Sequence, residues 1–141
     1  MKSFQVSTSI RATPQQIWPI LTDAAAYPSW NGAVSRIEGR IAPGETIKVH
    51  VPINPGRTFP VKVSTFEPPQ RMVWSGGMPL GLFRGVRTFT LMPKGDGTTE
   101  FRMEEVYSGP LASMMVRQIP DLSGAFEQFG QALKQRAESA G

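Results

Sequence analysis

The stretch "VSTSIRATPQQIWPILTDAAAYPSWNGAV", residues 6–34, contains the change of periodicity that decides the fold. Its first residues alternate apolar and polar side chains, a period of two that is typical of a strand with one buried face. Thr13, Pro14 and Gln16 follow with the spacing of a helix start: a hydroxyl N-cap, a proline in the first turn and a glutamine that completes a capping box. The stretch therefore predicts a first strand followed at once by a helix.

Two short helices are expected within this stretch. Ile17 and Leu21 lie on one face of the first helix. Pro19 predicts that this helix is bent or brief, because proline cannot donate its backbone hydrogen bond. Asp23 is in position to cap a second helical turn through the three alanines. Pro28 favours an end of that turn at "YPSW".

From about residue 33 onward the sequence predicts strands. The strand-like segments are "AVSRIEG", "TIKVHV", "FPVKVSTFE", "RMVWS", "GVRTFTLMP" and "TTEFRMEEVY". Turns rich in glycine, proline and aspartate separate them. Six consecutive strands with no helix between them indicate an antiparallel sheet.

The C-terminal part returns to a helical period. Its apolar residues recur at spacings of three and four: Leu122, Phe126, Phe129, Leu133 and Ala137. This stripe predicts a long helix from Asp121, a candidate N-cap, to Glu138. The preceding "LASMMVRQI" is interpreted as a further helical piece, joined to the long helix across a kink at Pro120.

Length, charge and residue types bound the class of protein. The 141 residues predict one domain, residues 1–141. The net charge is +4, but the 15 Lys and Arg residues form no block, which argues against nucleic-acid binding. The N-terminus lacks a signal peptide's apolar core and no stretch is long and apolar enough to span a membrane, so we expect a soluble, cytoplasmic protein without stable membrane insertion.

Several kinds of site are disfavoured by the residue inventory. The chain has no cysteine, which removes disulfides, thiolate metal ligands and cysteine nucleophiles. His50 is the one histidine, and its strand register places it on the solvent side. With scattered carboxylates and no glycine-rich phosphate loop, we expect neither a metal nor a cofactor.

The register of the last two strands predicts a charged pair. A three-residue turn at 95–97 sets Arg87 opposite Glu105 and Phe89 opposite Met103, so that apolar residues face apolar residues. We expect Arg87 and Glu105 to form a cross-strand ion pair on the inner side of the sheet. The pair is open to three interpretations: a structural contact, a site for a ligand's polar group, or, for Glu105, an acid or base in catalysis.

The stretch 6–34 resembles the opening of the SRPBCC superfamily, the START and birch-pollen-allergen-like proteins, and within it the polyketide cyclase/dehydrase type. The matching residues are Ala12, Pro14, Ile17, Trp18, Asp23, Tyr27 and Trp30. "FEPPQRMVWSGG", "RTFTLMPKGDGTTEF" and "EEVYSG" are also similar to this group, whereas Pro19 departs from it. The resemblance implies an α+β helix-grip fold, in which a curved seven-stranded antiparallel sheet wraps around the C-terminal helix and encloses a cavity for a hydrophobic molecule or lipid.

Candidate site residues follow from these inner faces and from flexible apolar side chains. The candidate ligand-binding residues are Trp74, Arg87, Phe89, Met103, Glu105, Tyr107, Met114, Met115, Phe126 and Phe129, with Ser75 as a further polar candidate. In "WSGGMPLGLFRGVR", residues 74–87, the candidate gate residues over a cavity mouth are Met78, Leu80, Leu82 and Phe83. The alternative is an ordinary hairpin connection that caps the core or a dimer interface.

Three functions stay open on the sequence. The first is a module that binds a small hydrophobic molecule. The second is an enzyme of the polyketide cyclase or aromatase kind, which works by positioning and proton transfer. The third is an interaction domain that uses the apolar loop at residues 76–85, and a homodimer is compatible with each.

Overall fold

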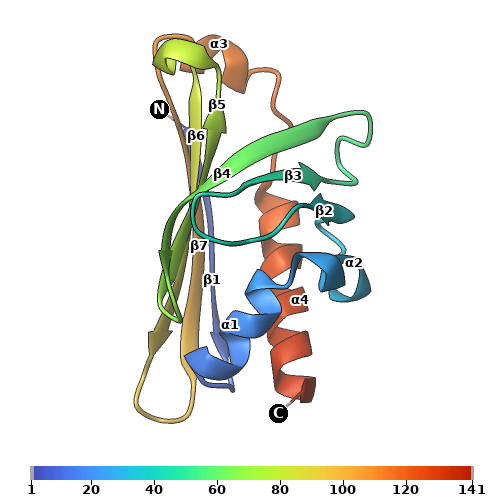
Figure 1. Cartoon of the computed structure of the whole chain (residues 1–141), viewed down its shortest axis with the longest axis vertical. Coiled ribbons are helices and arrows are strands. Elements are labelled where there is room, and N and C mark those ends of the chain that lie inside the picture. Colours follow the sequence, from blue (N-terminus) through green and yellow to red (C-terminus); the bar gives the residue numbers. More distant parts are fainter. Residues whose placement is uncertain (1, 141) are drawn as a thin grey trace.

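The computed structural model describes residues 2–140 and contains one antiparallel sheet of seven strands in the order β1-β7-β6-β5-β4-β3-β2 (Figure 1). The strands are β1 (Lys2–Ile10), β2 (Arg36–Glu38), β3 (Thr46–His50), β4 (Thr58–Glu67), β5 (Arg71–Gly77), β6 (Arg84–Pro93) and β7 (Thr99–Ser108). The prediction of a seven-stranded antiparallel sheet is confirmed.

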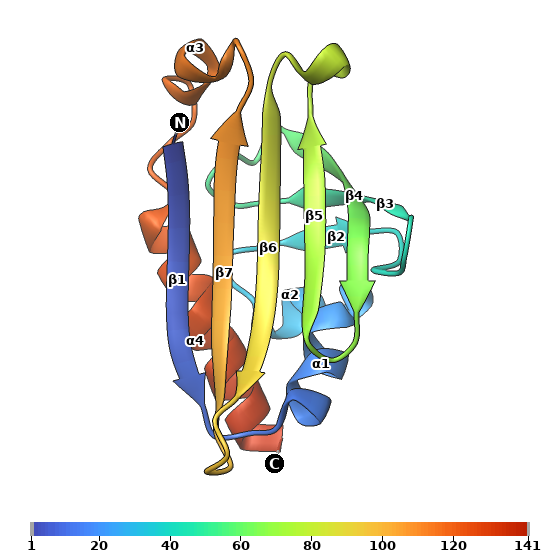
Figure 2. The same cartoon turned by 90° about the vertical axis from the view of Figure 1, so that its left-hand side faces the viewer.

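The longest helices lie on one side of this sheet, and two short helical segments lie beyond one end of its strands (Figures 1 and 2). The helical segments are α1 (Pro14–Thr22), the 3₁₀ turn η1 (Ala24–Ala26), α2 (Tyr27–Trp30), the 3₁₀ turn η2 (Pro79–Gly81), α3 (Ala112–Val116) and α4 (Ser123–Ala140). In Figure 1 the sheet curves around α4, and in Figure 2 β1, β7, β6 and β5 stand in front with α4 and α1 behind them. This is the expected helix-grip fold.

The start of α1 forms as its sequence predicts. The Thr13 hydroxyl accepts a hydrogen bond from the Gln16 backbone at 3.2 Å, and the Gln16 side chain accepts one from the Thr13 backbone at 2.9 Å. The helix continues through Pro19 and is brief, at nine residues. Asp23 stands at the N-cap of η1, but its side chain makes no capping bond within residues 2–140, so the expected cap is not formed.

The long helix begins two residues later than predicted. The Asp121 carboxylate accepts a hydrogen bond from the backbone N–H of Ser123 at 2.9 Å, and the first helical bond runs from Phe126 N–H to the Leu122 carbonyl. Asp121 therefore stabilises the turn that leads into α4, and the helix itself starts at Ser123.

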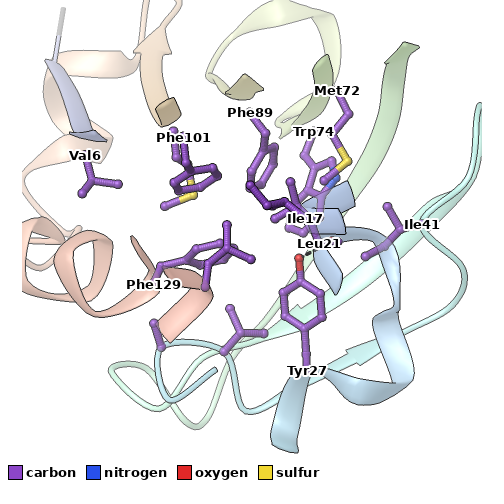
Figure 3. Close-up of a cluster of buried hydrophobic side chains, with 14 of the residues drawn as sticks. Val6, Ile17, Leu21, Tyr27, Ile41, Met72, Trp74, Phe89, Phe101 and Phe129 are labelled. Carbon is purple, nitrogen blue, oxygen red and sulfur yellow. Dashed lines mark hydrogen bonds between the residues drawn. The ribbon is translucent and has the colours of Figure 1, made fainter. Parts of the chain in front are cut away.

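Phe129 on α4 is the centre of the hydrophobic core (Figure 3). Its ring centroid lies 6.0 Å from that of Phe89, 6.1 Å from that of Phe101 and 6.1 Å from that of Tyr27. These side chains come from α4, the neighbouring strands β6 and β7, and α2, and all are fully buried. The aromatic cluster therefore fastens α4 and the short helices to the concave face of the sheet.

A bulge in β4 bends one side of the sheet. The register against β5 shifts between Val63 and Thr65, so Ser64 is an extra residue in the ladder. Such bulges bend a strand and increase its twist. Figure 1 shows β4 turning away from β5 toward β3, across the N-terminal end of α4. The sheet thus encloses more space beside this end of the helix than its core residues fill.

Candidate functional site

A cavity of about 400 Å³ lies between the sheet and the N-terminal end of α4. Its walls are mostly apolar, and the apolar side chains include Val34, Val49, Val51, Phe59, Val61, Trp74, Met78, Phe83, Met115, Ile119, Leu122 and Phe126. Gly76, Gly77 and Gly85 also line it, where no side chain occupies the space. The volume falls within the roughly 300–1,000 Å³ of small-molecule sites in proteins.

Trp74 and Phe126 separate this cavity from the core. Both side chains are buried and line the cavity. The Trp74 ring packs on Phe89, with 4.6 Å between centroids, and lies beside it in Figure 3. Because α4 begins at Ser123, Phe126 is the first fully buried residue of its apolar stripe. Past Phe126, the strands of the sheet extend beyond the first turn of α4. The cavity lies between these strand ends and the segment that precedes the helix.

A charged pair lies on the cavity wall, where the register predicts it. Arg87 on β6 pairs with Glu105 on β7. Arg87 Nε donates to Glu105 Oε1 at 3.2 Å, and Arg87 Nη2 donates to Glu105 Oε2 at 3.3 Å. The two side chains are only 17% and 15% exposed. The guanidinium also stacks over the Phe126 ring, 4.8 Å from its centroid. The cross-strand ion pair expected from the sequence is therefore present.

Tyr107 completes this cluster. Its hydroxyl donates to Glu105 Oε2 at 2.5 Å, and its ring stacks on that of Phe83 at 5.7 Å. Burial raises the pKa of Tyr107 above its ordinary value, and the neighbouring Glu105 carboxylate raises it further. The phenol therefore keeps its proton at neutral pH and acts as a hydrogen-bond donor. We call Arg87, Glu105 and Tyr107 the polar cluster.

Gly85 leaves room for the Tyr107 ring, because it has no side chain. The two residues are paired across β6 and β7, and a Cβ added to Gly85 would lie 3.2 Å and 3.3 Å from two ring carbons of Tyr107. A side chain here would press on the ring. The glycine therefore lets the aromatic ring lie flat over the strand beside the cavity.

The structure brings six of the ten predicted ligand-binding residues to the cavity. They are Trp74, Arg87, Glu105, Tyr107, Met115 and Phe126.

The other four lie elsewhere. Phe89, Met103 and Phe129 are fully buried in the core, because they sit further along the strands and the helix, where α4 covers the sheet. Met114 is 52% exposed and is not a lining residue. Ser75, the further polar candidate, does not line the cavity either, because successive strand residues face opposite sides and its neighbour Trp74 faces inward.

The four candidate gate residues divide into two pairs. Met78 and Phe83 line the cavity, whereas Leu80 and Leu82 do not. Leu80 is 95% exposed and has a left-handed backbone, with φ of 64°. The loop is tied by backbone hydrogen bonds of 2.8 Å from Met78 to Phe83 and from Leu111 to Leu82. Its inner side forms part of the cavity wall, and Leu82 ties it to the segment that follows β7, while Leu80 at its tip is exposed.

Sequence reasoning missed the part of the wall that comes from β3, β4 and their connection. Its apolar residues are Val49, Val51, Ile53, Phe59, Pro60 and Val61. Arg57 lies over the Phe59 ring at 5.5 Å. The alternation in "TIKVHV" indicates the inward face of β3. The approach of β4 to α4 depends on the bulge, which no sequence pattern marked.

Three further findings concern metal sites, His50 and membranes. Within residues 2–140, no three His, Cys, Asp or Glu side chains are grouped so as to hold a metal ion. His50 is half-buried and its Nε2 lies 2.6 Å from Glu38 Oε2, which lowers the pKa of Glu38. No helix in the described part of the chain is long and apolar enough to cross a bilayer.

The fold and the cavity define a helix-grip protein with an internal site between the sheet and its long helix. A family model described as "Polyketide cyclase / dehydrase and lipid transport" matches residues 1–138, and the chain belongs to this family. The resemblance to START-like proteins seen in residues 6–34 is therefore confirmed. No curated protein matches the chain.

Solved structures show the same fold at low sequence identity. A protein from Mesorhizobium loti is 22% identical, with a TM-score of 0.74 and 99% of each chain covered. A START superfamily protein from Mycobacterium smegmatis is 19% identical, with a TM-score of 0.72 and 99% of each chain covered. The di-domain ARO/CYC BexL from the BE-7585A biosynthetic pathway is 13% identical, with a TM-score of 0.72; the match covers 98% of this chain and 47% of BexL.

Proposed function

We propose that this protein binds a small hydrophobic molecule in the cavity and that the polar cluster orients the molecule's polar group. The observation that carries this proposal is the combination of an apolar cavity of about 400 Å³ with a hydrogen-bonded charged pair in its wall. Small-molecule sites have this composition, in which apolar walls supply affinity and a few polar groups set orientation.

The wall is suited to ligands of varied shape. Met78 and Met115 are unbranched and polarizable, so they adapt to irregular apolar surfaces. The strand side is stiffer, because Arg87, Glu105 and Tyr107 are held by one another and by the β6–β7 ladder. One side of the cavity therefore adjusts to the ligand while the other presents fixed hydrogen-bonding groups.

The first experiment is native mass spectrometry of freshly purified protein, followed by organic extraction and small-molecule analysis. We expect a defined apolar compound to co-purify, or a fluorescent apolar probe to bind with a stoichiometry of one. Ala125→Phe, which puts a large side chain on α4 where Ala125 lines the cavity, should abolish binding. Ala132→Phe is the matched control, because Ala132 is equally half-buried on the same helix but lies away from the cavity.

Three results would count against the proposal. Binding that is unchanged in Ala125→Phe would place the ligand elsewhere. An absence of any bound compound or probe would remove the binding function. If Arg87→Met and Glu105→Gln both keep wild-type affinity, the polar cluster has no part in binding.

Cyclase activity is the second candidate, favoured by the Tyr107 hydroxyl bonded to Glu105 beside the cavity. This pair offers a proton donor and an acceptor to a flexible substrate folded within the walls. The candidate Glu105 is, however, already engaged by Arg87 and Tyr107. A pH-dependent turnover of a poly-β-ketone substrate that is lost in Glu105→Gln would establish this function. Turnover that survives the substitution would exclude Glu105 as the catalytic group.

A further inference from the structure

The polar cluster carries no net charge. The positive Arg87 and the negative Glu105 are bonded through two hydrogen bonds, and Tyr107 is a neutral phenol. Arg57, the other charged residue that lines the cavity, is exposed and stacks on Phe59. An ionised ligand group placed at the cluster would therefore be a buried charge without a counter-ion.

The hydrogen-bonding capacity left on the cluster consists mainly of donors. A guanidinium has five N–H donors, and Arg87 gives two of them to Glu105. Within residues 2–140 the other three have no acceptor. Glu105 already accepts three hydrogen bonds, two from Arg87 and one from Tyr107. Nε1–H of Trp74, another lining residue, is also buried without an acceptor in the described chain. Arg87 and Trp74 therefore leave N–H donors in this wall without acceptors.

We infer that the ligand's inner polar group is an uncharged hydrogen-bond acceptor, such as the carbonyl of a ketone or an ester, and that the cavity rejects a carboxylate at this position. This inference rests on the proposed binding function. A carbonyl oxygen satisfies the free N–H groups of Arg87 without adding charge. A carboxylate would accept the same bonds, but it would lie beside Glu105 and would repel it.

The test compares methyl dodecanoate with its isomer tridecanoic acid. The two share their number of carbons, but at neutral pH the acid is ionised to tridecanoate and the ester is uncharged. Both are measured by displacement of an uncharged fluorescent probe. Wild-type protein should bind the ester more tightly than the carboxylate by about tenfold or more. Glu105→Gln leaves the Arg87 charge without a partner, so the carboxylate should gain affinity and the ratio should fall by about tenfold.

Glu104→Gln is the matched control. It removes the same charge from the neighbouring residue of β7, which faces the other side of the sheet and pairs with Arg102 at 3.7 Å. The ester-to-carboxylate ratio should not change in this variant. This control separates the local charge balance from the change in the net charge of the protein.

Each outcome decides the inference. Tridecanoate that binds wild-type protein as tightly as the ester overturns it, and so does a ratio that Glu105→Gln leaves unchanged. The wild-type ranking tests the inference even if Glu105→Gln does not fold. If the probe binds but neither ligand displaces it, the inference is overturned while the proposed function stands. If no probe or other apolar compound binds, the proposed function fails and this inference fails with it. A carboxylate preference in a protein that binds both ligands overturns the charge inference alone.

Discussion

Replacing Arg87 by methionine should destabilise the protein by about 2 kcal/mol. The methionine keeps an apolar stem of similar length but leaves the Glu105 carboxylate with Tyr107 as its remaining described donor. Removing one partner of a fully buried pair costs about 3–5 kcal/mol, whereas an exposed pair is worth about 0–1 kcal/mol. Side chains that are 17% and 15% exposed on the wall of a cavity lie between these limits.

A double-mutant cycle distinguishes this cause from general damage to the core. Glu105→Leu alone should also cost about 2 kcal/mol, because it leaves the Arg87 charge unpaired. The double variant, Arg87→Met with Glu105→Leu, removes both charges and should lose no more than about 1–2 kcal/mol.

The assay is urea unfolding followed by tryptophan fluorescence, with free energies of unfolding extrapolated to water. The sum of the two single losses should exceed the loss in the double variant by about 2–3 kcal/mol. If the two single effects simply add in the double variant, the ion pair has no coupling energy. The account of a mutually neutralising pair would then be wrong.

Three further predictions concern other parts of the chain. Gly85→Val should destabilise the protein by about 1–3 kcal/mol and weaken probe binding, because its Cβ would lie 3.2 Å from the Tyr107 ring. Equal urea midpoints and probe affinities for the variant and the wild type would contradict this. Leu80→Asn should raise the free energy of unfolding by about 0.5–1 kcal/mol, since asparagine tolerates the left-handed backbone better than leucine. A melting temperature of the variant below that of the wild type would contradict this. Hydrogen bonds from Lys134 and Arg11 lower the pKa of Glu138 from 4.5 to about 2, so its carboxylate stabilises the fold above pH 4.5 and this contribution is lost as the pH falls toward 2. Glu138→Gln should therefore be less stable at neutral pH and show a shallower loss of stability between pH 4.5 and pH 2, and an acid unfolding curve that runs parallel to wild type would refute this.

Local patterns were sufficient to predict the seven strands, the first and last helices, and the register of the last two strands. The capping box at Thr13 uses residues three apart in the chain, so its geometry is readable from the sequence. The turn at 95–97 allows one register that keeps apolar residues opposite one another, and this register sets Arg87 against Glu105. Because these contacts depend on spacing along the chain or across one turn, they required no knowledge of the tertiary structure.

The division between core and cavity depends on contacts that sequence spacing does not encode. Phe89 and Arg87 share the inner face of β6, yet Phe89 packs against Phe129 while Arg87 lines the cavity. The difference arises from the position of α4 along the strands, and the helix begins two residues after the predicted N-cap. Helix α3 has only five residues, too few for a periodic stripe to show whether Met114 or Met115 faces inward.

The neutral ion pair in the cavity wall has a consequence for the kinetics of binding. The net charge of +4 comes mostly from exposed side chains, whose fields are screened by salt within about 10 Å at 0.1 M ionic strength. Arg87 and Glu105 lie too close together to project a field into solvent. A charged molecule would therefore gain no attraction from this pair, and an uncharged one would reach the cavity at a rate insensitive to ionic strength.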